Sequence, residues 1–308
     1  MQRHRLFVRE PFTRQLGARA IFLLTVLLAG CVDLDQVTAL AKVADGAKAS
    51  LPVIAADFKG SCDRQNLYVH LPPGPPPVPP PPKACVNGDD FEKLGNNLIT
   101  EQNVLLDYFD ALGKLASSSS AGFQKSVGTL SASFKDAGLS AAQQTMATSA
   151  GNLAAAISDM ALQGYRKKKI ADIVGKADKD VTILANGLAD QVAPAAGTAV
   201  SATSYVSLLS NEGLLIDSYY AVPLAKDPNS LAAILVNRQW QDDVNQLNAR
   251  MNAAQAYRKL MVSLAAAHWK LASDTKGGHF DIKTLGKDLG PDVVQIEEAV
   301  AALQKDLR

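Results

Sequence analysis

The chain has 308 residues, of which 47% are apolar and 20% charged, so it can bury a substantial core and is not a disordered polymer. Five arginines and one glutamate lie in the first 30 residues, and without that segment the formal charge falls from +1 to −3. A nearly neutral chain has no excess of positive charge for a phosphate backbone, so we expect no nucleic-acid partner. Abundant Ala with only 6% aromatic residues favours helices.

The first 30 residues have the pattern of an export signal. Several arginines precede a nine-residue run, Ala20 to Leu28, that is apolar except for Thr25, and the run leads into Leu28-Ala29-Gly30-Cys31. A charged start, a short apolar stretch and small residues before a cleavage site are typical of secretory signals. The ending resembles the lipobox of bacterial lipoproteins, which implies that residues 1–30 are removed and that Cys31 becomes an acylated N-terminus. An ordinary signal peptide with a chance cysteine is the alternative.

The same resemblance implies a location. In Gram-negative lipoproteins, Asp directly after the acylated Cys commonly retains the protein in the inner membrane, and here that position is Val32. Two or more acyl chains anchor a protein stably. We therefore expect a palmitate-bearing lipoprotein of the outer membrane that faces the periplasm, with the membrane as its first partner.

Cys62 and Cys85 remain once Cys31 is acylated. Thiols pair in an oxidising compartment, so the sequence predicts a disulfide between them. Closing this loop would stabilise the fold by about 3 kcal/mol. Free or metal-bound thiols are the alternative, although no Cys-x-x-Cys spacing or His cluster accompanies them.

The segment between these cysteines is rich in proline. Residues 72–82 contain nine prolines and predict a polyproline II rod about 34 Å long. The opposite arm, Asp63–Leu71, contains Leu67, Tyr68 and Val69, which favour extended structure, so we expect a flattened finger. Preordered polyproline suits partner recognition, and a stiff spacer is the alternative. The candidate partner-binding residues are Pro75, Pro76, Pro79 and Pro80.

Apolar residues recur every three or four positions through most of the remaining chain, which predicts helices. The expected helices cover 33–59 with an interruption at Pro52, 90–116 with Asp89 as N-cap, 121–135, 140–174 with a continuation beyond Gly175 to Pro194, 200–223, 228–276 and 291–307. The longest begins at Asp227-Pro228 and ends before Gly277-Gly278. It carries a heptad seam, with Arg258 as the misfit, and this predicts a supercoiled partner helix.

We therefore predict an all-α fold, an elongated antiparallel helical bundle with long coiled-coil-like helices and a Pro-rich, disulfide-closed loop. The expected organisation is a signal peptide (1–30), an anchor with the first helix (31–61), a Pro-rich loop closed by Cys62 and Cys85 (62–88) and a helical bundle (89–308).

No constellation of catalytic residues is evident. The sequence has no Gly-x-Ser-x-Gly, His-Glu-x-x-His or glycine-rich phosphate loop, so we predict no catalytic residue, no metal ligand, no cofactor and no enzymatic activity. His70 and His279 lie in expected loops. His268 lies on the apolar seam, where a hydrogen-bonded core histidine is the favoured interpretation. The cluster Arg166–Lys169 is interpreted as a solvated helix face rather than a lipid-binding site.

Two stretches, Ala137–Ser158 and Gln191–Asn211, contain no charged side chain. Their small residues favour closely packed helices within a bundle. The alternative is a membrane-active, pore-forming-like protein in which they insert, and a small-ligand-binding bundle is a further possibility. The favoured hypothesis is a non-catalytic periplasmic lipoprotein with a structural or protein-interaction role.

Overall fold

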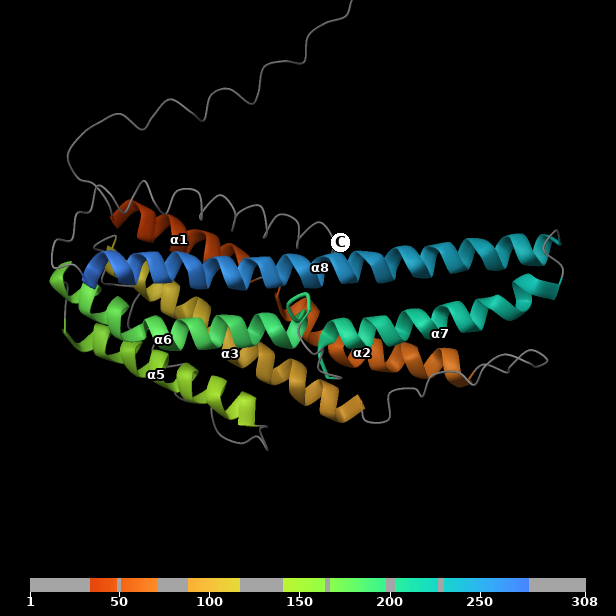
Figure 1. Ribbon diagram of the computed structural model, residues 1–308, viewed down its shortest axis with the longest axis horizontal. Coiled ribbons are helices and arrows are strands. Elements are labelled where there is room, and N and C mark those ends of the chain that lie inside the picture. Colours follow the sequence, from red (N-terminus) through yellow and green to blue (C-terminus); the bar gives the residue numbers. More distant parts are fainter. Residues whose placement is uncertain are drawn as a thin grey trace, which may run out of the picture. The chain divides into compact units, whose positions relative to one another are not determined.

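The computed structural model describes residues 34–48, 51–70, 88–116, 141–163, 167–197, 203–226 and 230–276. Within these ranges the fold is all-α, as predicted, and contains no strand (Figure 1). The helices are α1 (Leu34–Ala47), α2 (Leu51–His70), α3 (Gly88–Ala116), α5 (Ala141–Gln163), α6 (Lys167–Val192), α7 (Tyr205–Lys226) and α8 (Leu231–Lys276). The signal peptide, the Pro-rich segment and the helices predicted at 121–135 and 291–307 lie outside the described residues.

Helix α3 is antiparallel to α1 and α2, which follow one another along it. Gly113, near the C-terminal end of α3, meets the side chain of Ala41 in α1. Gly95, in the N-terminal half of α3, meets the backbone oxygen of Ala55 in α2. A Cβ atom at either glycine would collide with the neighbouring helix, so both glycines permit a close approach.

Helix α8 is antiparallel to α6 and α7, which also follow one another along it (Figure 1). Its 46 residues, at about 1.5 Å each, give a length of about 69 Å. Arg258, the misfit of the seam, donates 2.6 Å hydrogen bonds to Asp190 and to the backbone oxygen of Ala193 at the end of α6. Helix α6 ends at Val192, two residues before Pro194, where the sequence predicts a break.

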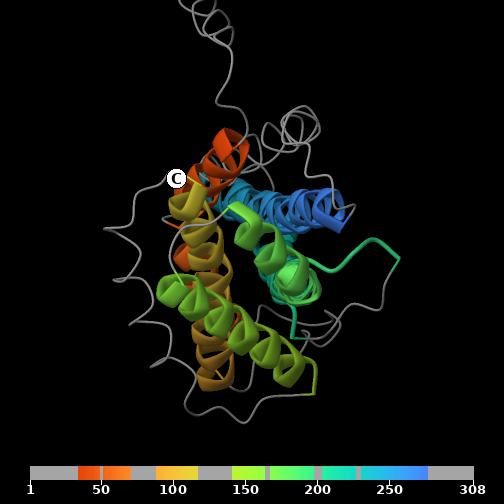
Figure 2. The ribbon, with the colours of Figure 1, turned by 90° about the vertical axis from the view of Figure 1, so that its left-hand side faces the viewer.

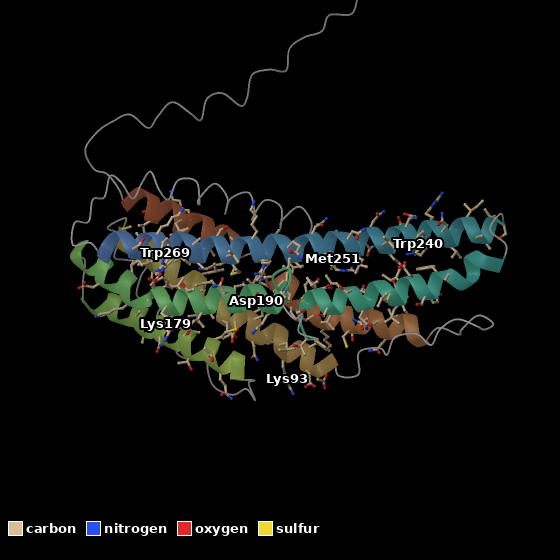
Figure 3. The ribbon with its side chains drawn as sticks, viewed as in Figure 1. Lys93, Lys179, Asp190, Trp240, Met251 and Trp269 are labelled. Carbon is tan, nitrogen blue, oxygen red and sulfur yellow. The ribbon has the colours of Figure 1, made fainter. Side chains whose placement is uncertain are left out.

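The apolar core lies among α1, the first half of α2, α3, α5, α6 and the C-terminal half of α8. Viewed toward the end where α8 finishes, α6 lies between α5 and α8 (Figure 2). Helix α7 reaches the core only as far as Leu209, and α8 reaches it only from Leu247 onward. We call the rest of these two helices, residues 210–226 and 230–246, the arm. Figure 3 shows Trp240 within the arm and Met251 where α8 enters the core region.

The extended structure predicted for Asp63–Leu71 is wrong as far as His70, because α2 is helical to that residue. Tertiary contacts override the local preference for extended structure. The hydroxyl of Tyr68 donates to Asp243 at 3.0 Å, and its ring lies 5.7 Å from that of Tyr219. A helix advances only about 1.5 Å per residue, so residues 63–70 do not form the extended arm of the expected flattened finger.

The helix predicted at 140–174, with its continuation beyond Gly175, is divided at a different place from the one expected. Helix α6 passes through Gly175 without interruption, whereas the chain leaves α5 after Gln163 and enters α6 at Lys167. Glycine inside a helix costs about 1 kcal/mol, and burial of the flanking Val174 and Ala177 offsets this cost. The helix expected to continue past residue 165 therefore ends earlier.

The longest helix begins three residues later than predicted, at Leu231 rather than Pro228. Ser230 caps it, since its Oγ accepts a 3.1 Å hydrogen bond from the backbone nitrogen of Ala233. Helix α7 continues to Lys226, past the proline at which it was expected to end. Helix α3 begins at Gly88, so the expected N-cap residue already lies in its first turn.

Candidate functional site

Of the predicted site residues, the structure describes Cys62. Its side chain is fully buried on α2, and its Sγ lies 3.9 Å from the position that a Cβ of Gly88 would occupy at the start of α3. The other predicted residues, which lie outside the described part of the chain, are Cys31, Cys85, Pro75, Pro76, Pro79 and Pro80. Lipidation, the disulfide and the proline surface therefore stay predictions.

His268 is a hydrogen-bonded core histidine, as predicted. Its Nε2 lies 2.9 Å from the hydroxyl of Tyr108, and its Nδ1 lies 3.3 Å from a carboxylate oxygen of Asp178. Burial lowers the pKa of His268, and the hydrogen bond and charge of Asp178 oppose that effect. Protein groups occupy both ring nitrogens of this fully buried side chain. His70 is the last residue of α2, and His279 lies outside the described residues.

A largely buried ion cluster joins three helices. Its members are Asp57 and Arg64 of α2, Glu212 of α7 and Arg250 of α8. Arg64 donates hydrogen bonds of 2.7 and 2.8 Å to Asp57, and of 2.7 and 3.1 Å to Glu212. Arg250 donates a further 2.7 Å bond to Glu212, whose side chain is fully buried. Two guanidinium groups thus balance two carboxylates.

Neutral side chains complete the hydrogen bonding of this cluster. The hydroxyl of Ser61 donates to Glu212 at 2.7 Å, and that of Tyr205 donates to Asp57 at 2.5 Å. Burial opposes the charged form of Arg64, but its hydrogen bonds to the two carboxylates raise its pKa overall. Burial and the charge of Asp57 raise the pKa of Tyr205, so this hydroxyl stays a donor.

The contacts of α2 continue outward from the ion cluster. The amide nitrogen of Gln65 donates to the backbone oxygen of Leu208 at 2.9 Å, and Asn211 donates to the side-chain oxygen of Gln65 at 2.6 Å. Further along, Tyr68 and Tyr220 both donate to Asp243 in the arm. The second half of α2 therefore lies against the arm through a row of polar contacts.

A second buried polar group lies on α3. Glu101 is 3% exposed, and burial raises its pKa to about 7. Among the described residues, its Oε2 and the side-chain nitrogen of Gln102 have no hydrogen-bond partner. The hydroxyl of Tyr257 donates a 3.1 Å hydrogen bond to the side-chain oxygen of Gln102. Glu101 is therefore protonated over part of the neutral pH range.

The free end of the arm exposes large apolar side chains. Leu231 is 73% exposed, Ile234 53% and Leu235 55%, all within the first two turns of α8. We call these three residues the tip patch. Exposed apolar residues concentrated in one place mark interaction surfaces more often than single ones do.

The ion cluster escaped prediction because its charges come from three segments far apart in the sequence. One signal was present: Glu212 is the first charged residue after the uncharged stretch Gln191–Asn211. A lone carboxylate that follows a run of small and apolar residues requires a compensating partner when it is buried. The sequence does not identify Arg64 and Arg250 as those partners.

Among the described residues, no group of three His, Cys, Asp or Glu side chains could hold a metal ion. No described helix is long and apolar enough to cross a membrane. The described part of the first uncharged stretch lies in α5, which packs on α3 and α6. The second is divided between α6, α7 and the break that separates them.

No known protein family, curated protein or solved structure matches this chain. Any functional proposal therefore depends on the chain's own residues.

Proposed function

We propose that this chain is an outer-membrane lipoprotein, anchored through acylated Cys31 on the periplasmic face, with a non-catalytic, protein-interaction role. The lipobox Leu28-Ala29-Gly30-Cys31 supports the anchor. The tip patch is the observation that carries the interaction role. Its three large apolar side chains remain 53–73% exposed at the end of a long helix.

The place of the tip patch relative to the start of α1 supports a protein rather than the anchoring membrane as the partner. Cys31, the proposed lipid attachment site, precedes Leu34 at the start of α1 by three positions in the sequence. That start is close to Gly113 of α3, because the backbone oxygen of Val37 lies 3.8 Å from the position of a Gly113 Cβ.

The same end of α3 lies beside the C-terminal half of α8, where Tyr108 meets His268. From His268 to Leu231, α8 extends for 37 residues, or about 55 Å. The start of α1 and the tip patch therefore lie toward opposite ends of α8. This separation suits an anchored protein that presents its binding surface away from the lipid.

Three finer features belong to this proposal. A Cys62–Cys85 disulfide would join the buried Cys62 to the segment that enters α3. Coiled-coil-like pairing within an elongated bundle would place Leu247 of the α8 seam against α7. The Cδ2 atom of Leu247 lies 2.9 Å from the position that a Cβ of Gly213 in α7 would occupy. The four prolines Pro75, Pro76, Pro79 and Pro80 would provide a second contact surface.

Site-specific photo-crosslinking in intact cells tests the role of the tip patch. A photoreactive amino acid replaces Leu235 in one strain and the exposed Gln255, on the same helix, in a matched control. We expect one protein adduct from position 235, none from position 255, and loss of the adduct when Ile234→Asp is added. Equal adducts from both positions, or an adduct to lipid alone, would contradict the proposal.

The anchor is tested separately by metabolic labelling with an alkyne-bearing palmitate analogue. The wild-type chain is expected to take up the label, and Cys31→Ser is expected to abolish it. Label retained in Cys31→Ser would refute the lipobox interpretation. Mass analysis without reductant is expected to show two hydrogens fewer than after reduction, as a Cys62–Cys85 bond requires.

A further inference from the structure

The second half of α2 meets its neighbours differently from the first half. Ile54, Ala55 and Phe58 belong to the apolar core cluster, and Cys62 is the one buried apolar side chain among the described side chains of α2 after Phe58. From Ser61 onward, α2 is hydrogen-bonded to α7 and α8 through the ion cluster, Gln65 and Tyr68.

A glycine marks the boundary between the two halves. Gly60 lies between Phe58, which packs in the apolar core, and Ser61, the first residue of α2 that bonds to Glu212. Glycine weakens a helix interior by about 1 kcal/mol relative to alanine. A Cβ there would lie 2.8 Å from a carboxylate oxygen of Asp57 and 3.1 Å from Arg64, so Gly60 also leaves room for their ion pair.

Arg64 is the more exposed of the two cations in the ion cluster, and its departure leaves one guanidinium group for two carboxylates. If Arg64 moves away with α2, Glu212 still accepts the 2.7 Å hydrogen bond from Arg250. Asp57 still accepts the hydrogen bond from Tyr205 and lies 3.8 Å from Arg250. Arg64 itself is 28% exposed in the closed arrangement and becomes hydrated on opening. Opening therefore leaves one negative charge in excess, shared by Glu212 and the partly exposed Asp57, and this cost favours the closed arrangement.

The closed arrangement is also incompletely bonded. Among the described residues, Nε of Arg250 is buried without a hydrogen-bond partner, since its distance to Asp57 is that of an ion pair only. A polar interface with a missing hydrogen bond opens more easily than a packed apolar core, because its groups regain hydrogen bonds to water.

We propose that Arg64 is a latch, and that residues 61–70 of α2 swing away from the arm about Gly60 as an intact helix while the apolar core stays folded. The latch controls the position of His70, the last residue of α2, and the Pro-rich segment directly follows that residue in the sequence. This inference does not depend on the identity of any partner or on the lipid anchor.

Distances between spin labels in the full chain test the latch. Labels carried by non-natural amino acids replace the exposed Leu67 of α2 and Ala221 of the arm, and a control pair replaces the exposed Asn103 and Asn186 of α3 and α6. Arg64→Met is expected to add a population with a longer 67–221 distance while the 103–186 distance stays unchanged.

Lys59→Met is the matched control, because Lys59 is also a cation on α2 but pairs with Glu92 of α3. It is expected to leave both distances unchanged. Arg64→Lys, which keeps the charge but loses the two-pronged bond to Asp57, serves if Arg64→Met does not fold, and it is expected to give a smaller open population. An unchanged 67–221 distance in folded Arg64 variants, or broadening of both distances together, would overturn the proposal.

Discussion

At the scale of single residues, the charges that matter most are those with the least exposure. Glu212 is fully buried and accepts hydrogen bonds from Ser61, Arg64 and Arg250, whereas Glu92 pairs with Lys59 at the surface with half of its side chain exposed. Both are carboxylates in ion pairs between helices. Burial decides that only the first is important for stability, because removing one member of a buried pair leaves the others uncompensated.

Glu212→Gln is therefore expected to lower the free energy of unfolding by about 3 kcal/mol or more, since Arg64 and Arg250 lose a shared counterion. Glu92→Gln is expected to change it by less than about 0.5 kcal/mol. Urea unfolding followed by circular dichroism measures both. Similar losses in the two variants would show that burial does not distinguish these carboxylates.

Glu101 gives stability a dependence on pH with a definite sign. Its pKa is raised to about 7 in the folded chain by burial, against 4.5 as its ordinary value, so the folded state holds the proton more tightly. Its stabilising contribution is complete below pH 4.5 and is lost as the pH rises through 7. The loss amounts to about 3 kcal/mol.

Glu101→Gln removes this titration and is expected to be more stable than the wild type at pH 8, with a smaller difference at pH 4.5. Parallel urea titrations at the two pH values measure the change. If the free energies of unfolding of the wild type and of Glu101→Gln differ by the same amount at both pH values, a raised pKa for Glu101 in the folded protein is excluded.

At the scale of helices, the apolar periodicity of the sequence predicts well that a helix exists. It predicts poorly the residues at which the helix begins and ends. Helix α3 follows the apolar spacing of its sequence closely, and Pro194 correctly marks the end of α6. The errors occur where tertiary contacts decide the outcome. Tyr68 belongs to a locally extended pattern but is held in α2 by Asp243, and Gly175 stays helical because its neighbours are buried. Local propensity cannot report contacts between distant segments.

Two glycines in helices provide a matched test of the close approach between α2 and α3. Gly95→Ala is expected to lower the free energy of unfolding by about 1–3 kcal/mol, because the new Cβ collides with the backbone of Ala55. Gly151→Ala, in α5 with open space around it, is expected to raise it by about 0.5–1 kcal/mol. Thermal unfolding of both variants is the measurement. Stabilisation by both substitutions would contradict the tight contact at Gly95.

At the scale of the whole molecule, the described helices form an apolar core and an arm that differ in how they are held. The sequence predicts the core from the apolar spacing of its helices. It does not predict the arm as a separate part, because the seam of α8 is continuous through Trp240 and Met251 and gives no sign of where α3 and α6 cease to be neighbours. The ion cluster lies at this transition and has no counterpart in any local pattern.

The core also allows a test of the membrane-active alternative. Ala150 and Ala155 lie on α5 within the first uncharged stretch, but Ala150 is fully buried whereas Ala155 is exposed. In a packed bundle, Ala150→Lys buries an unpaired ammonium group and is expected to cost about 3 kcal/mol or more, while Ala155→Lys is expected to change stability by less than about 0.5 kcal/mol. Urea unfolding measures both.

Dye-loaded anionic vesicles provide the second readout for the same pair of variants. If the bundle stays packed, the vesicles are expected to stay sealed at micromolar protein, whether or not one of the two alanines is replaced by lysine. If this stretch inserts into the membrane, the wild-type chain would release the dye. A lysine at either position would then suppress the release, because a charge opposes entry into the apolar layer. Release that both lysines suppress, with unchanged stability of Ala150→Lys in solution, would favour insertion over the packed arrangement of α5 on α3 and α6.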